Sequence, residues 1–522
     1  MRKHRVKIII VLMSAALFSL AFSLFYPSLL GKMDDPQSDA NGSEITTVFS
    51  LSPSLQFKNG ESIEDNVHLR WVRDQLGFNI RYLWTAPDST FTTKLKLHLL
   101  NNREMPDIVP VRTEIVHDLI DSGQFMAVDD LFDQYASPVW KAAMQEDPSV
   151  WYPYIRNGQR YAIPILDYSY NSDTIMWIRE DWLHNLGLAV PRTLTEIESV
   201  LDAFTHRDPD QNGINDTYGL AVSLQNSFNT WMSDISWVFG MYGVLPVQWN
   251  ATEGDSLSYG SIQAKAKQGL ETIRKWKSAG YFADDAMWQD EEMAANLFTQ
   301  GKAGIIVGPH WMNYWPLNSL QANNPEARII AVSLPTGPAP VSYYRANSPR
   351  NGAILINKNM ADPKLLFTYM NFLFDHQGTG DGDYVYGLAE GYDYAIVNGK
   401  PTADRSLIPG GYVHVSAYTL TYDGARIPSK WVEMVGDEQK QALLSQLPRR
   451  MPSAFSGPPT ATMKEKWEQL LQLEHETYLQ IVYGKKDLSF FDEFVKRWLA
   501  NGGIPIEKEV NAWYASTVPT GK

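Results

Sequence analysis

The chain has 522 residues, more than one hydrophobic core usually supports, so we expect two domains or lobes of about 150–250 residues each. Its net charge of −14 at pH 7 argues against nucleic acid or an anionic lipid surface as a partner, because either would favour a basic face. Cysteine is absent, which excludes disulfides, thiol nucleophiles, zinc–thiolate sites and iron–sulfur clusters. The 17 tryptophans fill a large core and leave aromatic side chains to spare.

The amino-terminal residues 1–33 have the pattern of an export signal. Basic residues from Arg2 to Lys7 lead directly into an uncharged run over 8–30. That run is long enough for a membrane span of about 20 residues, yet the small residues around Ala21 also suit cleavage. Both outcomes stay open, and in both the bulk of the chain faces outward because the positive flank stays in the cytoplasm. Residues 34–44 read as a flexible tether.

From residue 45 the chain alternates strand-like and helix-like patterns. The ranges 45–51 and 79–84 are rich in strand formers, whereas 65–76 and 91–100 carry helical spacing. This βαβ opening predicts an α/β fold in which helices cover a mostly parallel sheet. The same patterns predict a buried strand at 303–307 and helices at 181–188, 194–204, 262–278, 361–374 and 463–483.

Residues 208–216 have the spacing of a calcium-binding loop. Oxygen-bearing side chains stand at positions one, three, five and nine around a glycine at position six, as in most of an EF-hand-like loop. Position twelve is Gly219, where an EF-hand has a bidentate glutamate, so one ligand is missing or comes from another segment. A polar turn without metal is the alternative. The expected Ca²⁺ ligands are the side chains of Asp208, Asp210, Asn212 and Asp216 and the carbonyl of Ile214.

Several short segments, each weak alone, together resemble the extracellular solute-binding proteins of ABC importers, and more narrowly their oligosaccharide-binding branch. Their order and spacing carry the resemblance over nearly everything after the tether. The segments are Tyr161–Pro164, Ile178–Leu188, Pro191–Glu196, the 208–216 loop, Gly301–Gly304, Glu390–Gly391, Gly502–Ile504 and Glu509–Tyr514.

The resemblance implies a two-lobed periplasmic-binding-protein-like fold of type II, with a hinge between lobes and an oligosaccharide held in the cleft. The first lobe is expected at about 45–165 plus part of 330–400. The second is expected at about 166–330 plus much of the carboxyl-terminal region. It also implies ABC importer membrane subunits as partners, a monomer, no enzymatic activity, and a structural Ca²⁺ away from the cleft.

One departure concerns anchoring. Most Gram-positive members carry a lipid-modified cysteine, and this chain has none. We therefore expect either a retained amino-terminal anchor on the outer face of the membrane or a secreted or periplasmic protein.

Sugar binding needs flat apolar faces for pyranose rings and a few polar groups for hydroxyls. Most tryptophans are core residues, so position must select among them. Open α/β sheets bind ligands at the carboxyl ends of strands, and the residues that follow predicted strands are the better candidates. On this basis we expect ligand contacts from Trp311, Asn313, Tyr168, Asp167 and Arg112, and also from Trp237.

Two alternatives and one open question remain. A secreted tryptophan-rich chain could be a glycoside hydrolase that uses two carboxylates, although the adjacent acidic pairs here do not face one another. It could also be a surface sensor that binds sugar without an importer. Arg345 and Arg350 could clamp the carboxylate of an acidic sugar, which we leave open.

Overall fold

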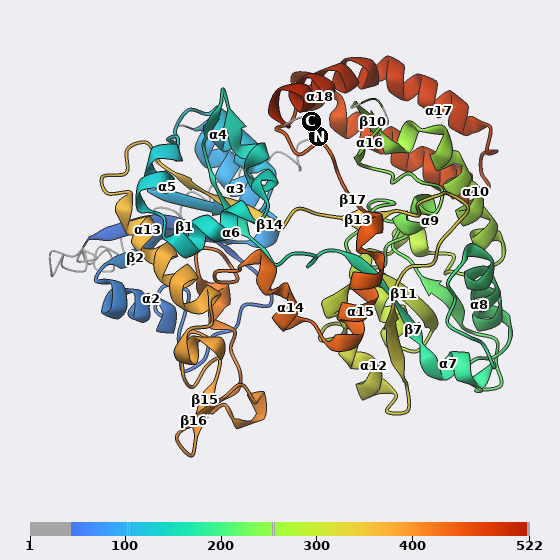
Figure 1. The fold of residues 1–522 in the computed structure, drawn as a ribbon, viewed down its shortest axis with the longest axis horizontal. Coiled ribbons are helices and arrows are strands. Elements are labelled where there is room, and N and C mark those ends of the chain that lie inside the picture. The colour runs from blue at the N-terminus through green and yellow to red at the C-terminus, as the bar shows by residue number, and fades with distance from the viewer. Residues whose placement is uncertain (1–42, 102, 104, 253, 255, 519–522) are drawn as a thin grey trace, which may run out of the picture.

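The computed structural model describes residues 43–518 except 102, 104, 253 and 255, and shows two lobes (Figure 1). The expected export segment 1–33 and most of the tether lie outside the described residues. The hydrophobic cores of the first lobe draw on residues 45–166 and 353–427. Those of the second lobe draw on 175–344 and 431–510. The first lobe's second segment therefore extends past the expected residue 400.

The first lobe combines short helices with a small central sheet. Its strands are β1 (Glu44–Leu51), β2 (Asn79–Pro87), β3 (Ile108–Val111), β4 (Ile155–Arg156), β5 (Gln159–Arg160), β6 (Ile163–Leu166), β14 (Arg350–Ile356), β15 (Ala395–Val397) and β16 (Lys400–Thr402). Its helices are α2 (Val67–Trp71), α3 (Asp88–Leu100), α4 (Ile115–Asp121), α5 (Asp129–Tyr135), α6 (Pro138–Gln145), η2 (Pro148–Tyr154) and α13 (Lys364–Phe372).

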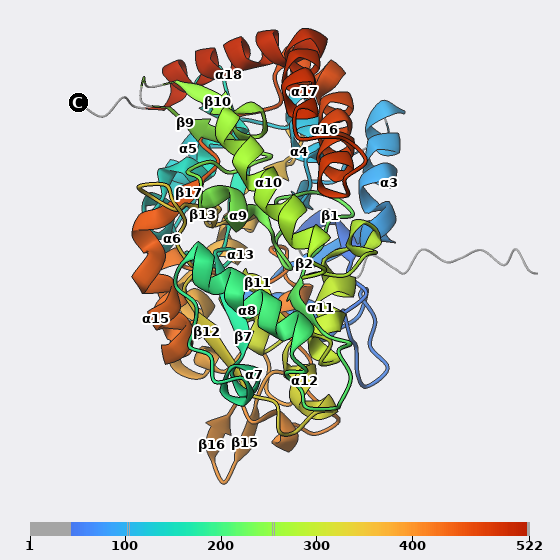
Figure 2. The ribbon, with the colours of Figure 1, turned by 90° about the vertical axis from the view of Figure 1, so that its right-hand side faces the viewer.

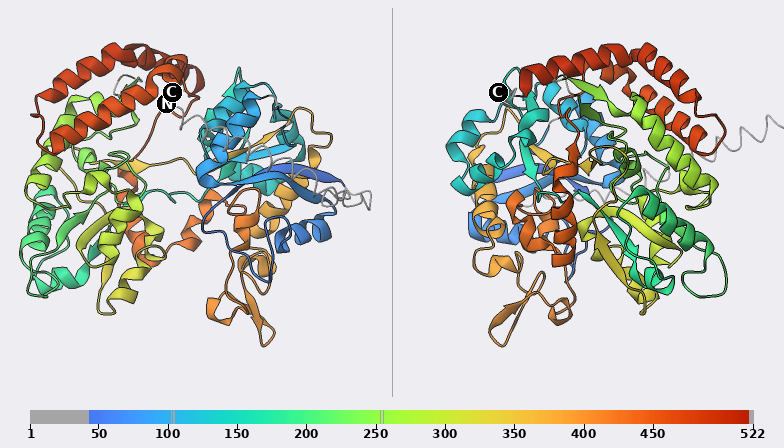
Figure 3. Two further views of the ribbon diagram at one scale, coloured as in Figure 1. Left: turned by 180° about the vertical axis from the view of Figure 1, so that it is seen from behind. Right: turned by 45° about the vertical axis from the view of Figure 1, so that its right-hand side comes forward.

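The second lobe carries the carboxyl-terminal helices over one end, where they run towards the first lobe, as Figure 2 and Figure 3 show. Its strands are β7 (Thr174–Arg179), β8 (Tyr218–Ala221), β9 (Trp249–Ala251), β10 (Leu257–Tyr259), β11 (Ala303–Pro309), β12 (Ile329–Val332), β13 (Tyr344–Ala346) and β17 (Arg450–Pro452). Its helices are α7 (Glu180–Asn185), α8 (Leu194–His206), α9 (Ser236–Gly240), α10 (Ala264–Ser278), α11 (Glu291–Thr299), α12 (Asn318–Asn323), α14 (Trp431–Met434), α15 (Asp437–Gln446), α16 (Ala461–Val482), α17 (Phe490–Trp498) and α18 (Ile504–Thr517).

The central sheets are mixed, which corrects the expectation of mostly parallel sheets. In the first lobe β14 lies antiparallel to both β3 and β6. In the second, β7 lies antiparallel to both β11 and β12, while β11 and β8 are parallel. The reason is topological: β7 and β14 are the strands by which the chain enters a lobe after crossing from the other, and each runs against its neighbours.

Local sequence signals explain individual element ends. Thr193 caps α8 through a capping box with Glu196, so that both backbone and side-chain groups at the helix start are satisfied. Gly187, with φ of 65°, ends the turn after α7. In the first lobe the Asp107 carboxylate accepts hydrogen bonds from the Thr46 backbone N–H and hydroxyl at 2.8 and 2.6 Å, which fixes β1 beside β3.

Within residues 43–518, leaving aside the four undescribed positions, no helix combines the length and apolar character that crossing a bilayer requires.

Helix α16 is anchored to the second lobe by a buried carboxyl group. Glu474 accepts hydrogen bonds from the Tyr259 hydroxyl at 2.8 Å and the Ser261 hydroxyl at 2.6 Å. Burial raises the pKa of Glu474 to about 7, from 4.5. The uncharged form is therefore the one that the folded core prefers.

We predict that Glu474→Gln removes a pH dependence of stability. Because the folded pKa lies above the unfolded one, this group's contribution is full below about pH 4.5 and is lost as pH rises through about 7, a difference of about 3 kcal/mol. The variant should unfold at higher urea concentration than the native protein at about pH 8, and similarly at about pH 5. Parallel pH profiles for the two proteins would contradict this assignment.

Candidate ligand-binding cleft between the lobes

A cavity of about 1380 Å³ lies between the two lobes and is lined by both. From the first lobe it receives α3, the segment after β3, α4 and η2. From the second it receives residues 247–249 and 450–459, the start of α16 and the end of α18. Both lobes contribute because the chain crosses between them three times, at about 167–173, 347–349 and 428–430.

Aromatic side chains form much of the cavity wall. On the second-lobe side Trp249 and Trp467 stack, with ring centroids 6.4 Å apart and planes 17° from parallel, and Phe455 packs edge-on against Trp249. On the first-lobe side the wall includes Tyr152 and Tyr154. Aromatic residues from both lobes line the cavity, which suits a ligand that is itself a series of flat, partly apolar units.

An ion pair joins the lobes beside this cavity. Lys464, at the start of α16, places its ammonium 2.6 Å from a carboxylate oxygen of Asp121 at the end of α4. The same carboxylate receives the Arg156 guanidinium at 2.9 Å. Tyr152 of the first lobe also meets Trp513 of α18 edge-on, at 6.3 Å between ring centroids. The carboxyl-terminal helices thus touch both lobes.

The first crossing segment holds two of the residues expected at the site. The Asp167 carboxylate is buried, accepts a hydrogen bond from Arg426 at 2.6 Å and another from the Asn171 amide at 2.9 Å. The Arg426 guanidinium also lies over the Tyr168 ring, at 5.2 Å from its centroid. Asp167 and Tyr168 therefore lie in the hinge, with Arg426 joining the first crossing to the third.

Trp311 belongs to a stack of three indoles next to the same segment. Its indole N–H donates to the Asn171 carbonyl at 2.8 Å. Its ring stacks with those of Trp231 and Trp315 at 5.9 and 6.4 Å, and the Trp315 side chain is 45% exposed. Asn313 follows in the same turn and has a buried side-chain oxygen with no hydrogen-bond partner among the described residues. The stack offers a second aromatic face at the lobe boundary.

The structure separates the six expected residues into three groups. Arg112 lines the interlobe cavity. Trp311, Asn313, Tyr168 and Asp167 gather at the crossing segment. Trp237 is a correction, because it is 1% exposed, packs against Trp276 and donates its indole N–H to the Asp234 carbonyl. Helix α9 directs it into the core, so we exclude it from the site.

Sequence reasoning did not select the cavity aromatics. Trp249 was one of many tryptophans without a distinguishing position, and Trp467 lies in a helical pattern typical of packing. Neither residue follows a strand of the main sheets, so the preference for residues at strand ends did not select them. They reach the cavity through the fold of the carboxyl-terminal helices, which local sequence does not reveal.

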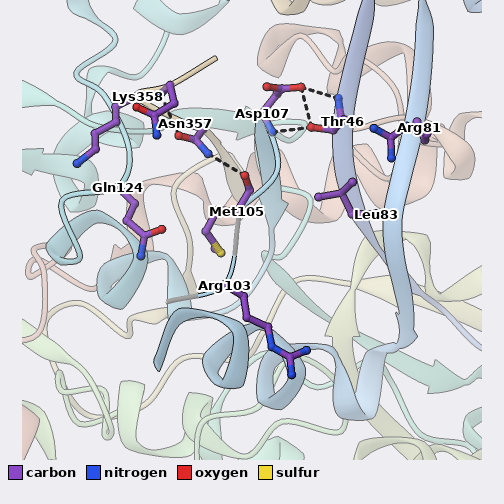
Figure 4. Close-up of a pocket in the computed structure, with 10 residues that line it drawn as sticks. Thr46, Arg81, Leu83, Arg103, Met105, Asp107, Gln124, Asn357 and Lys358 are labelled. Carbon is purple, nitrogen blue, oxygen red and sulfur yellow. Dashed lines mark hydrogen bonds between the residues drawn. The ribbon is translucent and has the colours of Figure 1, made fainter. Parts of the chain in front are cut away.

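A smaller cavity of about 470 Å³ lies within the first lobe (Figure 4). It is lined partly by structural polar groups: Asp107 is engaged by Thr46, and the Asn357 amide donates to the Met105 carbonyl at 2.8 Å. Arg81 at its edge pairs with Glu44 at 2.9 Å. Because the second lobe contributes nothing to its lining, a ligand there could not couple to movement of the lobes.

The 208–216 loop folds around its own carboxylates. Asp208 Oδ1 and Oδ2 accept from the backbone N–H groups of Asn212 and Gly213 at 3.0 and 2.9 Å. The Asn212 amide donates to Asp210 at 2.9 Å and to Asp216 at 3.3 Å. The loop therefore brings the expected ligand side chains together, on the surface and away from the interlobe cavity.

Among the described residues no group of three or more His, Cys, Asp or Glu side chains is arranged to hold a metal ion, but two features of the loop favour a cation there. Asp210 Oδ1 is buried with no hydrogen-bond partner among the described residues. Burial raises the pKa of Asp210, and the hydrogen bond with Asp208 raises it further. A divalent cation would relieve both costs. One contact disfavours a cation in this loop. The Lys302 ammonium lies 2.5 Å from Oδ2 of Asp216 and already neutralises that carboxylate.

Gly219 has a packing reason for departing from the EF-hand pattern. It lies in β8, buried against α8, and a Cβ there would come within 2.9 Å of the Leu201 backbone. A glutamate at this position is therefore excluded by the contact between strand and helix. Any remaining cation ligand must come from water or from another segment.

The family described as bacterial extracellular solute-binding protein matches residues 57–380, which is more than half of the chain. The polygalacturonan/rhamnogalacturonan-binding protein YtcQ of Bacillus subtilis (strain 168) is 24% identical over 344 residues, covering 64% of this chain and 66% of YtcQ.

Solved structures agree in fold. Alginate-binding protein AlgQ2 without calcium ion superposes with a TM-score of 0.67 at 18% identity, covering 91% of this chain and 99% of AlgQ2. An EF-hand mutant of the ABC-transporter substrate-binding protein FusA of Streptococcus pneumoniae, in complex with fructo-nystose, has a TM-score of 0.65 at 16% identity over 91% of this chain and 99% of FusA. With its two lobes, crossing segments and interlobe cavity, the chain belongs to the bacterial extracellular solute-binding protein family.

Proposed function

We propose that this protein binds an oligosaccharide between its lobes and delivers it to the membrane subunits of an ABC importer. The observation that carries the proposal is the interlobe cavity of about 1380 Å³, with aromatic walls on both sides. Its volume lies above the usual range for drug-sized ligands, about 300–1000 Å³, and so suits a ligand of several sugar units. The names of the relatives support the ligand class, since they bind polygalacturonan, alginate and a fructo-oligosaccharide.

The mechanism follows from which lobe each lining residue belongs to. Trp467 belongs to the second lobe and Tyr152 to the first, so a saccharide that contacts both favours a closed arrangement over an open one. Movement is confined to three short crossings, which restricts it to rotation of the lobes about them. Importer subunits would then distinguish the closed surface from the open one.

The remaining features of the proposal concern location and assembly. The family is extracellular, and we propose that this protein acts outside the cytoplasm as a monomer, without catalysing a reaction on the sugar. Its partners would be the oligosaccharide and the importer, with the membrane reached only through the amino-terminal segment.

We predict that a thermal-shift screen of oligosaccharides identifies a ligand that raises the melting temperature, since a ligand that binds the folded state stabilises it by mass action. Small-angle scattering should show compaction at saturating ligand. Trp467→Ala should weaken binding about tenfold or more, because it removes an aromatic face of the cavity.

Trp288→Ala is the matched control, since this indole is 66% exposed and does not line the cavity. It should bind as the native protein does. Release of new reducing ends from the ligand, or the absence of any saccharide ligand, would overturn the proposal.

We also propose that the 208–216 loop binds a structural Ca²⁺. Asp208, Asp210, Asn212, Asp216 and the carbonyl of Ile214 would hold it, and the ion would supply charge neutralisation between the two adjacent carboxylates. Two relatives support this: AlgQ2 was solved without calcium ion, and FusA as an EF-hand mutant. Because no residue of the loop lines the cavity, the ion would stabilise the second lobe without contacting the saccharide.

We predict that Ca²⁺ raises the melting temperature of chelator-treated protein and that Asp210→Asn abolishes most of this rise. Saccharide affinity should stay within about twofold in both cases, because no loop residue lines the cavity. Gly219→Glu should destabilise the protein and leave Ca²⁺ affinity no higher, owing to the clash with Leu201. Equal Ca²⁺ stabilisation of the native protein and Asp210→Asn would refute the proposed ligand set.

A further inference from the structure

Two arginines project from neighbouring strands at the first-lobe wall of the cavity. Arg112 follows the last residue of β3, and Arg350 is the first residue of β14, the antiparallel neighbour of β3. Both line the interlobe cavity. Neither guanidinium has a hydrogen bond or an ion pair to another side chain within residues 43–518 as described, and one nitrogen of Arg350, Nη1, is buried without a partner.

Each guanidinium is supported by a tyrosine ring. The Arg112 guanidinium lies over Tyr422 at 4.5 Å from the ring centroid, and the Tyr422 hydroxyl donates to the Pro110 carbonyl at 3.0 Å. The Arg350 guanidinium lies over Tyr154 at 5.7 Å, and the Tyr154 hydroxyl donates to the Gly352 carbonyl at 3.1 Å. Both rings are fixed to the same strand pair, so they orient the arginines without using up their N–H groups.

Gly352 provides the room for this arrangement. Its φ of 107° is one that side chains other than glycine rarely adopt. A Cβ at this position would lie 2.3 Å from the Val111 carbonyl oxygen and 3.1 Å from Cγ of Arg112. The side chain of Arg112 thus passes directly against the backbone of β14, where a larger residue would displace it.

We propose that Arg112 and Arg350 form a clamp for the carboxylates of an acidic saccharide, so that the ligand is a uronic-acid oligosaccharide. This inference rests on the proposed function and names the substrate class of the same cleft. A planar guanidinium with unused N–H groups matches a carboxylate through two parallel hydrogen bonds, which a neutral hydroxyl cannot reproduce.

Nearby acids do not already satisfy the two arginines. Glu114 is close enough to feel the charge of Arg350, but it is paired with His117 at 3.1 Å. Asp423 is close enough to feel the charge of Arg112, but it is paired with Arg426 at 3.3 Å. The other acids that line the cavity are Asp118, Asp147 and Glu468.

The net charge of the chain makes cations at the site itself necessary for an anionic ligand. A protein of net charge −14 repels an anionic ligand at long range, and the repulsion is screened within about 10 Å at 0.1 M salt. Binding of a uronate therefore depends on cations at the site itself. The clamp supplies two of them at the end of one strand pair.

The test measures affinity by calorimetry for three matched sets of probes: uronic-acid oligosaccharides from pectin and alginate, their methyl esters, and neutral oligosaccharides of similar length. We expect the acidic probes to bind most tightly, and methyl esterification to weaken binding at least about tenfold. Arg112→Ala and Arg350→Ala should each weaken acidic binding by a similar factor and leave any neutral binding within about twofold. Arg350→Lys should recover only part of the loss, because it keeps the charge but not the planar pair of donors.

Arg73→Ala is the control, since Arg73 is exposed, pairs with Asp74 and does not line the cavity. The melting temperature of each variant without ligand reports whether it folds, and the lysine variants serve if an alanine variant does not. Tightest binding of a neutral probe, or acidic binding unchanged in the double alanine variant, overturns the clamp and leaves the proposed function standing. Absence of binding by every probe overturns the proposed function itself.

Discussion

The structure depends on buried ion pairs that hold the crossing segments together. Asp167 joins the first crossing to Arg426 near the third. At the end of the same crossing, Asp173 is fully buried and accepts hydrogen bonds from Arg450 at 2.7 Å and from the Tyr344 hydroxyl at 3.2 Å. Removing one partner of such a pair leaves a buried charge unmatched, at a cost of about 3–5 kcal/mol. Ion pairs therefore hold the hinge segments together, whereas apolar packing stabilises the lobes on either side.

This division explains how a cleft can be both deformable and precise. Each lobe has its own hydrophobic cores, and within the described residues none of these cores spans the crossings. Polar contacts between the lobes can rearrange without opening a core. Each aromatic residue and each arginine that lines the cavity, by contrast, lies on an element that belongs to a single lobe. Ligand-contacting groups thus move as rigid sets when the lobes rotate.

Much of the fold was predictable from sequence, because strands 45–51 and 79–84 and helices such as 194–204 carry clear periodicity. Arg112 follows β3 and lines the cavity, and Trp311 lies at the lobe boundary, while contact of either with a ligand stays a prediction. The prediction for Trp237 was wrong, since local sequence does not distinguish a tryptophan that helix α9 turns inward.

The loop from 208 to 216 also shows what local sequence can and cannot predict. Its own spacing predicted that the carboxylates would converge. The absence of a glutamate at Gly219 could not be interpreted until the contact with Leu201 was seen. Features that depend on residues within about ten positions were predictable, and those that depend on which helix packs on which strand were not.

The ion pair between Asp121 and Lys464 has a consequence for the resting protein. It bridges the lobes, and its Asp121 and Lys464 side chains are 33% and 49% exposed, so dissolved salt reaches it. Raising the ionic strength therefore weakens this contact between the lobes. Because an exposed pair contributes only about 0–1 kcal/mol, rotation of the lobes can break this contact at small cost.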